Sequence, residues 1–221
     1  GTYNVLEASK NLNTEQLIVT STSETYGSAQ KIPINESHRL IGQSPYAASK
    51  ISADQLAVSY WRSFNLPVKI IRPFNTYGPR QSYRAVIPSI IMQAINNKSI
   101  KLGNIQTTRD YTYVSDLCEA FFKFSKIKRL YGTPVNVGTN KEFKIKDIAK
   151  SIIKIVNPKL KIKIDKKRLR PSKSEVERLK CDNSFFINEV NWKPKISFKL
   201  GLEHTIKWIK ENKNSYHDNY G

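Results

Sequence analysis

The chain has 221 residues, of which 39% are hydrophobic and 25% are charged. This length and composition are ordinary for a folded globular protein and exclude a disordered or fibrous chain. The longest apolar runs, such as 86–92, are far shorter than the roughly 20 residues that cross a membrane, and no charged-then-apolar leader opens the chain. The two cysteines and three histidines are widely separated, so we expect neither a disulfide framework nor a metal site. We therefore expect a soluble, cytoplasmic protein with no membrane partner.

The formal net charge of +19 raises the question of nucleic-acid binding. Residues 141–180 hold 15 Lys and Arg against 5 Asp and Glu, so over half of the excess lies in this segment. Within it, 159–164 alternates lysine with Leu or Ile, which predicts a strand with one solvated face. Aromatic residues do not alternate with these lysines as a stacking surface for bases requires. We interpret the segment as a solvated surface, with a phosphate-bearing ligand or an anionic polymer as the alternative, and we do not expect nucleic-acid binding.

Apolar residues at helical spacing alternate along the chain with short apolar runs typical of strands. The predicted elements, in chain order, are a helix over 1–12, a strand over 17–21, a helix over 44–64, a strand over 68–72, a helix over 86–97, strands over 100–102 and 110–114, a helix over 115–126, a strand over 135–137, and helices over 144–156 and 200–210. Ser44 and Pro45 are a typical cap and first-turn residue for the longest helix. This alternation predicts an α/β fold with a doubly wound parallel sheet covered on both faces.

Polar side chains follow two of the predicted strands. Thr22, Ser23 and Glu24 come directly after the first strand, and the segment 72–80 reads Arg-Pro-Phe-Asn-Thr-Tyr-Gly-Pro-Arg at the end of the second. Open parallel sheets bind their ligands at the carboxyl ends of the strands. We therefore expect these two clusters to line one crevice.

Tyr46 and Lys50 are four residues apart on the predicted helix that lies between those clusters in sequence. That spacing places both side chains on one helix face, about one turn apart. An ammonium group near a phenol favours the phenolate and lowers the tyrosine pKa from about 10, so that the tyrosine can act as a base. The pair is therefore a candidate for proton transfer.

Four segments, 21–27, 46–50, 72–79 and 109–116, resemble successive signatures of the extended short-chain dehydrogenase/reductases that act on nucleotide sugars. Together with 170–176, they are most similar to the NAD-dependent 4,6-dehydratases of that family, especially those of bacterial surface-sugar pathways. The resemblance implies a lyase that oxidises a nucleotide-diphosphate sugar at C4, eliminates water across C5 and C6, and reduces C6. It also implies NAD as cofactor and a homodimer in which the helices 1–12 and 44–64 of both subunits meet.

The resemblance begins near the middle of the family's NAD-binding Rossmann domain. None of the nine glycines forms the phosphate-binding fingerprint of a dinucleotide site. We therefore expect a truncated Rossmann-like sheet, and a fragment that is inactive alone. On this basis, 1–80 is the C-terminal half of the NAD-binding domain and 81–221 is mainly the substrate-binding region, from which about 100–140 returns to the sheet.

The resemblance also implies roles for individual residues. Tyr46 would take the proton of the C4 hydroxyl, and Lys50 would hold the ribose of NAD and lower the pKa of the phenol. Glu24 would take the C5 proton, and Thr22 would hydrogen-bond the C4 oxygen. Ser23 stands where glucose-type 4,6-dehydratases usually carry an acidic Asp, whereas mannose-type dehydratases and uronate decarboxylases carry Ser, as here.

Further residues are implied at the cofactor and at the substrate. Pro73 is expected beside the cofactor with the tyrosine and the lysine. The expected substrate-binding residues are Asn75, Arg80, Arg109 and Arg170. The last two would grip the diphosphate, because the planar donors of a guanidinium meet phosphate oxygens two at a time.

Other functions remain open at this stage. A nucleotide-sugar 4-epimerase shares Tyr46 and Lys50 but needs no base at C5, so Glu24 favours the dehydratase. A uronate decarboxylase shares the Thr-Ser-Glu sequence, but 46–50 fits dehydratases better. A truncated, inactive chain that binds nucleotide sugars or nucleic acid is the non-enzymatic alternative.

Tyr26 is interpreted as a packing group, and Cys118 as a small buried side chain.

Overall fold

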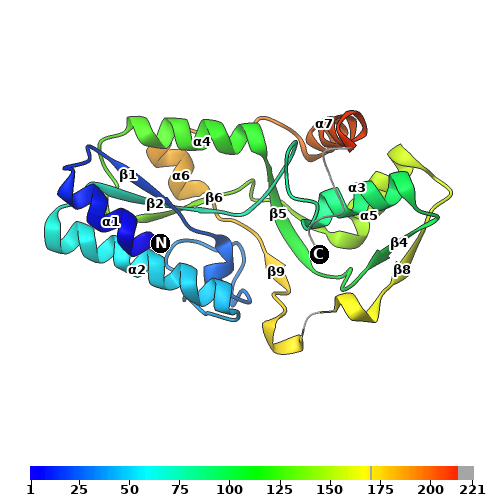
Figure 1. The fold of residues 1–221 in the computed structure, drawn as a ribbon, viewed down its shortest axis with the longest axis horizontal. Coiled ribbons are helices and arrows are strands. Elements are labelled where there is room, and N and C mark those ends of the chain that lie inside the picture. The colour runs from blue at the N-terminus through cyan, green and yellow to red at the C-terminus, as the bar shows by residue number, and fades with distance from the viewer. Residues whose placement is uncertain (170, 214–221) are drawn as a thin grey trace.

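The computed structural model describes residues 1–169 and 171–213, and in it helices and strands alternate as the sequence predicts (Figure 1). The α-helices are α1 (Thr2–Asn11), α2 (Pro45–Phe64), α3 (Val86–Asn96), α4 (Val114–Lys126), α5 (Ile145–Val156), α6 (Ser184–Val190) and α7 (Phe198–Glu211). The strands are β1 (Leu17–Thr20), β2 (Val68–Pro73), β3 (Asn75–Tyr77), β4 (Ser99–Leu102), β5 (Thr108–Tyr113), β6 (Pro134–Val137), β7 (Glu142–Lys144), β8 (Lys161–Ile164) and β9 (Arg178–Leu179). Three short 3-10 helices are η1 (Ser23–Tyr26), η2 (Lys166–Arg168) and η3 (Ser172–Ser174).

A three-stranded parallel sheet of order β1-β2-β6 forms one end of the molecule (Figure 1). Helices α1 and α2 pack on one face, where Leu6 meets Ile70 of β2. Helices α4 and α6 pack on the other, where Phe124 meets Val135 of β6. The central strand β2 is buried from Val68 onward, as expected for a parallel strand covered on both faces. The prediction of a doubly wound parallel sheet is confirmed.

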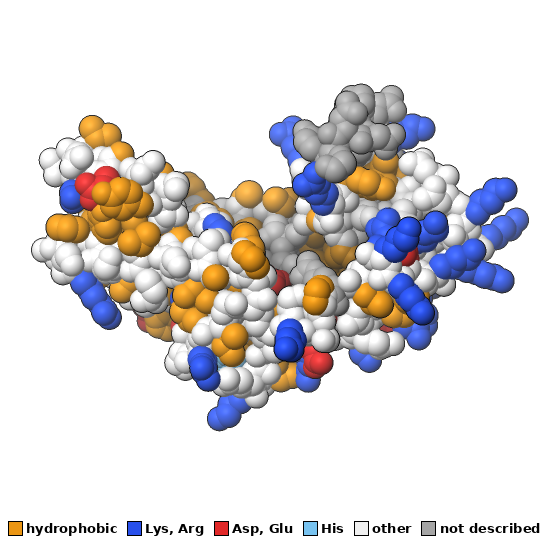
Figure 2. Space-filling view, turned by 60° about the horizontal axis from the view of Figure 1, so that its bottom comes forward, with side chains coloured by type: hydrophobic (Ala, Val, Ile, Leu, Met, Phe, Trp, Pro, Cys, Tyr) orange, Lys and Arg blue, Asp and Glu red, His pale blue; other side chains and the backbone are white. Residues whose placement is uncertain are grey.

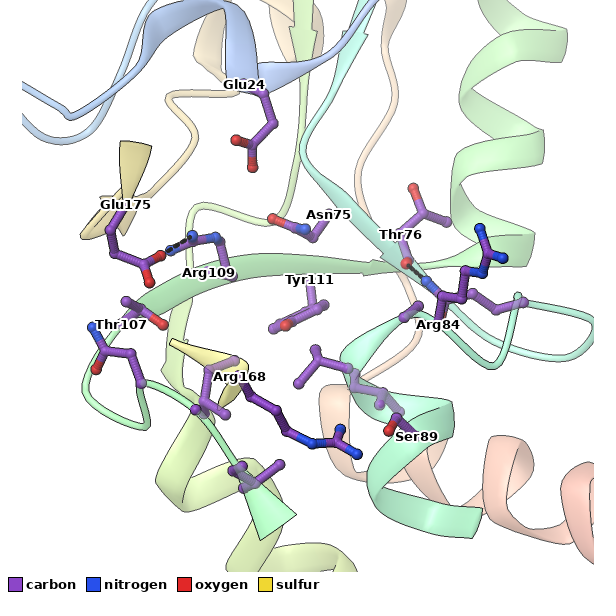
Figure 3. Close-up of a pocket in the computed structure, with 18 residues that line it drawn as sticks. Glu24, Asn75, Thr76, Arg84, Ser89, Thr107, Arg109, Tyr111, Arg168 and Glu175 are labelled. Carbon is purple, nitrogen blue, oxygen red and sulfur yellow. Dashed lines mark hydrogen bonds and ion pairs between the residues drawn. The ribbon is translucent and has the colours of Figure 1, made fainter. Parts of the chain in front are cut away.

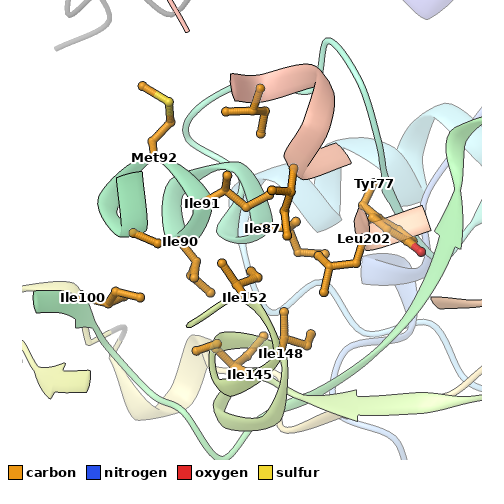
Figure 4. Packing of buried hydrophobic residues seen from close by; sticks show 14 of the residues in the cluster. Tyr77, Ile87, Ile90, Ile91, Met92, Ile100, Ile145, Ile148, Ile152 and Leu202 are labelled. Carbon is orange, nitrogen blue, oxygen red and sulfur yellow. The ribbon is translucent and has the colours of Figure 1, made fainter. Parts of the chain in front are cut away.

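The other end is built around β5, whose six residues are all buried. Strand β3 pairs with it in parallel, β7 antiparallel and β9 in parallel, whereas β4 and β8 form a separate two-stranded sheet. Helices α3, α5 and α7 enclose an aliphatic core that includes Ile90, Ile148, Ile152 and Leu202 (Figure 4). Because β3 follows β2 after a single residue, the end of the first sheet leads directly into the second sheet.

The start of α2 fixes the position of Tyr46. The Oγ of Ser44 accepts a hydrogen bond from the backbone N–H of Ala47 at 3.1 Å, and Pro45 occupies the first helical position. The helix ends at Asn65, which adopts a left-handed conformation with φ of 54°. Both the cap and the length predicted from the sequence are confirmed.

Lys69 is a buried cation in β2. Its ammonium donates hydrogen bonds to the carbonyl oxygens of Phe124, at 2.7 Å, and of Ile127, where α4 ends, and it lies over the rings of Phe124 and Tyr131. Carbonyls at the C-terminal end of a helix lack intrahelical partners and carry partial negative charge, so they attract this cation. Removal from water still disfavours the charged form, and burial lowers the pKa of Lys69 from 10.5 to about 8.

We expect Lys69 to make the free energy of unfolding rise with pH between about 8 and 10.5. In this interval the unfolded chain holds a proton that folded Lys69 has released, so raising the pH favours the folded state. The variant Lys69→Met should lack this contribution. Urea unfolding of both proteins across the interval measures it as a difference that grows with pH in favour of the wild type. A difference that stays constant with pH would contradict the lowered pKa.

The basic segment lies on the surface of the lobe that contains α5, β4 and β8, where Figure 2 shows lysine and arginine side chains gathered. Lys161 and Lys163 of β8 are exposed while Ile162 between them packs against the core, so the predicted solvated face is confirmed.

The interpretation of Cys118 as buried is wrong, because position 118 lies on the outer face of α4 and its side chain is exposed. Within the described residues, no helix has both the length and the apolar character needed to cross a bilayer.

Candidate functional site

The turn η1 begins where β1 ends and carries Glu24. The Oγ1 of Thr22 accepts a hydrogen bond from the backbone N–H of Glu24 at 3.2 Å, and its carbonyl accepts one from the hydroxyl of Thr25 at 2.8 Å. Ser23 and Thr25 are buried, whereas the side chain of Glu24 is half-buried. Thr22 therefore caps the turn, and the cap holds Glu24 at the carboxyl end of β1.

A cavity of about 380 Å³ opens below Glu24 (Figure 3). Glu24 points into it from η1, Asn75 enters from β3, and Arg109 and Tyr111 enter from β5. Its other polar lining residues include Thr76, Gln81, Arg84, Ser89, Asn104, Thr107, Arg168 and Glu175. The two sequence clusters that were expected to share a crevice thus meet around this cavity.

Among the described lining residues, three arginines and two glutamates carry charge. Arg109 is only 8% exposed, and its Nη1 donates to the carbonyl of Thr108 at 2.9 Å. Its Nη2 lies 3.8 Å from the Oε1 of Glu175. Arg84 and Arg168 line the same space. Positive charge exceeds negative by one, and the guanidinium groups provide the paired donors that phosphate oxygens accept.

Asn75 presents a polar atom for which the described residues provide no partner. Its Oδ1 is buried in β3 and accepts no hydrogen bond. Buried polar atoms in folded proteins are nearly always paired, so an unpaired acceptor in a cavity wall is suited to a ligand that brings a donor. Tyr111 beside it is buried, and burial raises the pKa of its phenol, so the hydroxyl stays protonated.

A second cavity of about 420 Å³ is lined by Glu24, Ser44, Tyr46 and Ser174. Tyr46 is 53% exposed at the start of α2, so its phenol is accessible to a ligand. Glu24 lines both cavities. Glu24 is therefore the residue shared by the space that holds the candidate base and the space that holds Asn75 and Arg109.

Lys50 and Pro73 lie at the carboxyl edge of the first sheet. The Nζ of Lys50, one helical turn beyond Tyr46, donates to the carbonyl of Thr20 at 3.0 Å, at the end of β1. An ammonium has three N–H donors, so this bond leaves two for a ligand. Pro73 is the last residue of β2 and pairs with Val137. Lys50 is on the same helix as Tyr46, and its bond to Thr20 brings it to the strand end from which the Glu24 turn begins.

The remaining predicted residues are not part of this arrangement as described. Arg80 is exposed, adopts φ of 65° and lies outside the lining of both cavities. Arg170 lies outside the described residues. Sequence reasoning missed Arg84, Arg168 and Glu175 as lining residues. Glu175 falls inside the quoted segment 170–176, so its position in sequence was a usable signal. Arg84, in the turn before α3, and Arg168, in η2, meet at the cavity only in the tertiary structure.

A family model described as GDP-mannose 4,6 dehydratase matches residues 1–205. The dTDP-D-glucose 4,6-dehydratase of Homo sapiens is 32% identical over 218 residues, covering 96% of this chain and 61% of that protein. A UDP-glucuronate 4-epimerase of Thermodesulfobacterium geofontis is 31% identical, covering 96% of this chain and 64% of that protein. Among solved structures, the dTDP-glucose 4,6-dehydratase of Bacillus anthracis in complex with NAD superposes with a TM-score of 0.86 at 29% identity, covering 96% of this chain and 67% of that one. The chain thus spans about three fifths of the length of these curated relatives.

Proposed function

This chain belongs to the GDP-mannose 4,6-dehydratase family of extended short-chain dehydrogenase/reductases, and from this we propose that the whole protein is an NAD-dependent nucleotide-sugar 4,6-dehydratase. The observation that carries the proposal is the position of Glu24, which lines the cavity of Tyr46 as well as that of Asn75 and Arg109. A dehydratase needs a second base for the C5 proton, beside the base that acts at C4. A carboxylate residue shared by the two cavities, beside a tyrosine in one of them, is suited to that need.

We propose that the first cavity binds the nucleotide-diphosphate sugar. Arg109 is suited to the diphosphate because its guanidinium is buried and held by backbone and carboxylate contacts. Arg84 and Arg168 add positive charge to the same walls. The unpaired Oδ1 of Asn75 is suited to a hydroxyl of the sugar. Arg80 and Arg170 keep the substrate-binding roles that the family resemblance implies.

Tyr46, Lys50 and Pro73 fit the nicotinamide end of NAD. Lys50 retains free donors for the hydroxyls of a ribose, and the exposed phenol of Tyr46 can approach a bound sugar. When bound, NAD accepts a hydride from C4 of the sugar and later returns it to C6. The role of the protein is to place these groups at one edge of the sheet, where parallel sheets hold nucleotides.

In the proposed mechanism, Tyr46 accepts the proton of the C4 hydroxyl as that carbon is oxidised. The resulting C4 ketone acidifies the C5 hydrogen, and Glu24 removes it while the C6 hydroxyl leaves. Ser23, beside it, has no carboxyl group, so the protonated Glu24 is the group we assign to convert the leaving hydroxyl into water, and C5 takes a proton from solvent when C6 is reduced. Thr22 uses its oxygen to cap the turn and keeps its own hydrogen to donate to the C4 oxygen.

Product analysis of the whole protein tests this proposal. Incubation with NAD and a panel of nucleotide-diphosphate hexoses should yield a 4-keto-6-deoxy sugar nucleotide from one of them, detected by mass as the loss of one water. The alternative is a 4-epimerase, which relatives such as the UDP-glucuronate 4-epimerase favour. An epimer of unchanged mass from every accepted substrate would establish the epimerase and refute the dehydratase. The sugar product, a cytoplasmic location and a role in polysaccharide biosynthesis are parts of the same proposal.

We also propose the domain division implied by the family: 1–80 in the NAD-binding domain and 81–221 mainly in the substrate-binding region. The return of β6 to the first sheet, beside β2, supports the assignment of about 100–140 to both. The fragment alone is proposed to be inactive.

We propose that the whole protein is a homodimer joined through α1 and α2. Large apolar side chains are exposed on both helices, among them Tyr3 and Val5 on α1 and Leu56 and Phe64 on α2. Figure 2 shows hydrophobic side chains gathered at that end of the molecule. Tyr60 and Trp61 of α2 do not belong to this face, because both pack in the core between the helices and the first sheet, and Trp61 also lies against Tyr131 in the loop before β6. The outward apolar face is what a second copy would cover.

Leu56→Glu is expected to shift the protein from dimer to monomer, because a carboxylate buried without a partner destabilises an interface. Sedimentation velocity at micromolar concentration measures the shift. Phe122→Glu is the matched control, since Phe122 is an exposed aromatic residue on α4, away from α1 and α2. A wild-type monomer, or a dimer that Leu56→Glu leaves intact, would remove this interface from consideration.

A further inference from the structure

A chain of hydrogen bonds crosses the interior of the first sheet from α2 to η1. The Oδ2 of Asp54 on α2 accepts from the Nε of Arg72 on β2 at 2.9 Å. The Nη1 of Arg72 donates to the hydroxyl of Tyr26, the last residue of η1, at 2.9 Å. The same hydroxyl donates to the Oδ1 of Asn136 on β6 at 2.7 Å. All four residues are buried, so this is an internal network that involves no surface contact.

The network connects the two elements that carry the candidate proton-transfer residues. Asp54 lies one turn beyond Lys50 and two turns beyond Tyr46 on α2, so it is on the same side of the helix. Tyr26 is two residues from Glu24 in η1. Neither Tyr26, Arg72 nor Asp54 lines either cavity, so none of them can touch a bound sugar there.

A gain in folding stability does not explain why this ion pair is buried. Burying an ion pair removes both charges from water, and well-packed apolar residues in its place are often as stable or more stable. One oxygen of Asp54, Oδ1, is buried without a partner, which adds to that cost. What such a network provides is a fixed geometry, because its hydrogen bonds form together at one relative position of the elements that carry the residues.

The hydroxyl of Tyr26 must be protonated to make both of its hydrogen bonds in this network. Burial raises the pKa of Tyr26 to about 12, against the opposing influence of Arg72, so its hydroxyl is protonated at neutral pH. A protonated hydroxyl accepts one bond and donates another, as the contacts with Arg72 and Asn136 require. The interpretation of Tyr26 as a simple packing group is therefore incomplete.

We propose that Arg72, bound to Asp54 on one side and to Tyr26 on the other, is a positioning residue that holds the Glu24 turn and the Tyr46 helix in one fixed relation. The catalytic meaning of that relation rests on the proposed dehydratase function, whereas the mechanical coupling does not. Arg72 acts through the backbone of the two elements and touches no substrate.

Amide hydrogen exchange on variants at the two ends of the network tests the coupling. Tyr26→Phe removes only the hydroxyl, and Asp54→Asn removes only the charge. Each single variant should raise exchange about tenfold in both 22–26 and 45–54, as the weakening of buried hydrogen bonds in a coupled set implies. Tyr77→Phe is the matched control, because it removes a buried hydroxyl that donates to Phe198 outside the network. Exchange in α3, which packs in the separate aliphatic core, should not change in the two network variants.

Two results would overturn the proposal. If each variant loosens only its own element, the contacts are independent; if α3 loosens equally, the effect is global destabilisation. Kinetics of the whole protein give the second readout: Tyr26→Phe should lower kcat about tenfold and leave KM unchanged, since misplaced catalytic groups slow the reaction without removing a substrate contact. A raised KM with unchanged kcat would refute positioning. If the whole protein shows no dehydration at all, the proposed function fails, and the exchange experiment still decides the coupling.

Discussion

Glu24→Gln is expected to reduce formation of the 4-keto-6-deoxy product by about 10² to 10⁴ in the whole protein, because removal of a general base typically slows a reaction by that factor. Glutamine keeps the size of the side chain and the cap that Thr22 provides to the backbone of residue 24, so the turn should persist. Only the carboxylate of this residue, which lines both cavities, is lost. The measurement is product formation together with exchange of the C5 hydrogen in deuterated water, and both should collapse by a similar factor.

Glu175→Gln is the matched control for that experiment. Glu175 is the other carboxylate of the first cavity, but it contacts Arg109 and does not line the cavity of Tyr46. Because Glu175 holds Arg109, we expect its loss to change KM, but we expect kcat within a few fold of the wild type for this variant. Equal losses in the two variants would mean that the general charge of the cavity matters and that Glu24 has no specific role. Product formation by Glu24→Gln within a few fold of the wild type would remove Glu24 as the C5 base and favour the epimerase.

Local signals were sufficient to predict most elements of the fold. The Ser44 cap and Pro45 define the start of α2, and the buried apolar run from Val68 defines β2. The strands that the sequence did not reveal are β3, β7 and β9, which have two or three residues each. Two or three residues are too few to show a periodic pattern. These strands form because β5 provides backbone partners for them. Their existence is a property of the tertiary structure.

The residues of the candidate site also fall into those that the sequence can place and those that only the tertiary structure places. Glu24, Asn75 and Arg109 follow or lie on strands whose ends can be predicted, so sequence reasoning could bring them together. Arg84 lies in the turn before α3 and Arg168 in η2, which are distant in sequence, and no local pattern indicates that their side chains line one space. The exposed position of Cys118 was missed because an apolar helix pattern shows which residues are apolar but not which face the core covers. The network through Arg72 was missed for a related reason, since a charged residue in an apolar strand shows its partner only in three dimensions.

Tyr46→Phe is expected to stop the reaction at its first step, and this distinguishes it from Glu24→Gln. Phenylalanine keeps the ring at the start of α2 and removes the hydroxyl that would take the C4 proton. Without that transfer the C4 ketone cannot form, so the C5 hydrogen is never acidified. We expect turnover to fall by about 10² to 10⁴, with no transient absorbance of reduced nicotinamide and no C5 exchange. In Glu24→Gln, by contrast, the transient absorbance should survive while C5 exchange is lost.

The contrast between the two variants tests the order of steps as well as the assignments. Tyr3→Phe serves as the control for Tyr46→Phe, because Tyr3 is an exposed tyrosine on α1 that lines neither cavity, and its loss of hydroxyl should leave turnover unchanged. If Tyr46→Phe retained the transient absorbance, another group would be the base at C4, and the pairing of Tyr46 with Lys50 would be structural. If both Tyr46→Phe and Glu24→Gln lost the absorbance, Glu24 would act before or during the first oxidation, and its assignment to C5 would fail. Only retention in Glu24→Gln together with loss in Tyr46→Phe agrees with a base at C4 on α2 and a second base at C5 on the turn beside it.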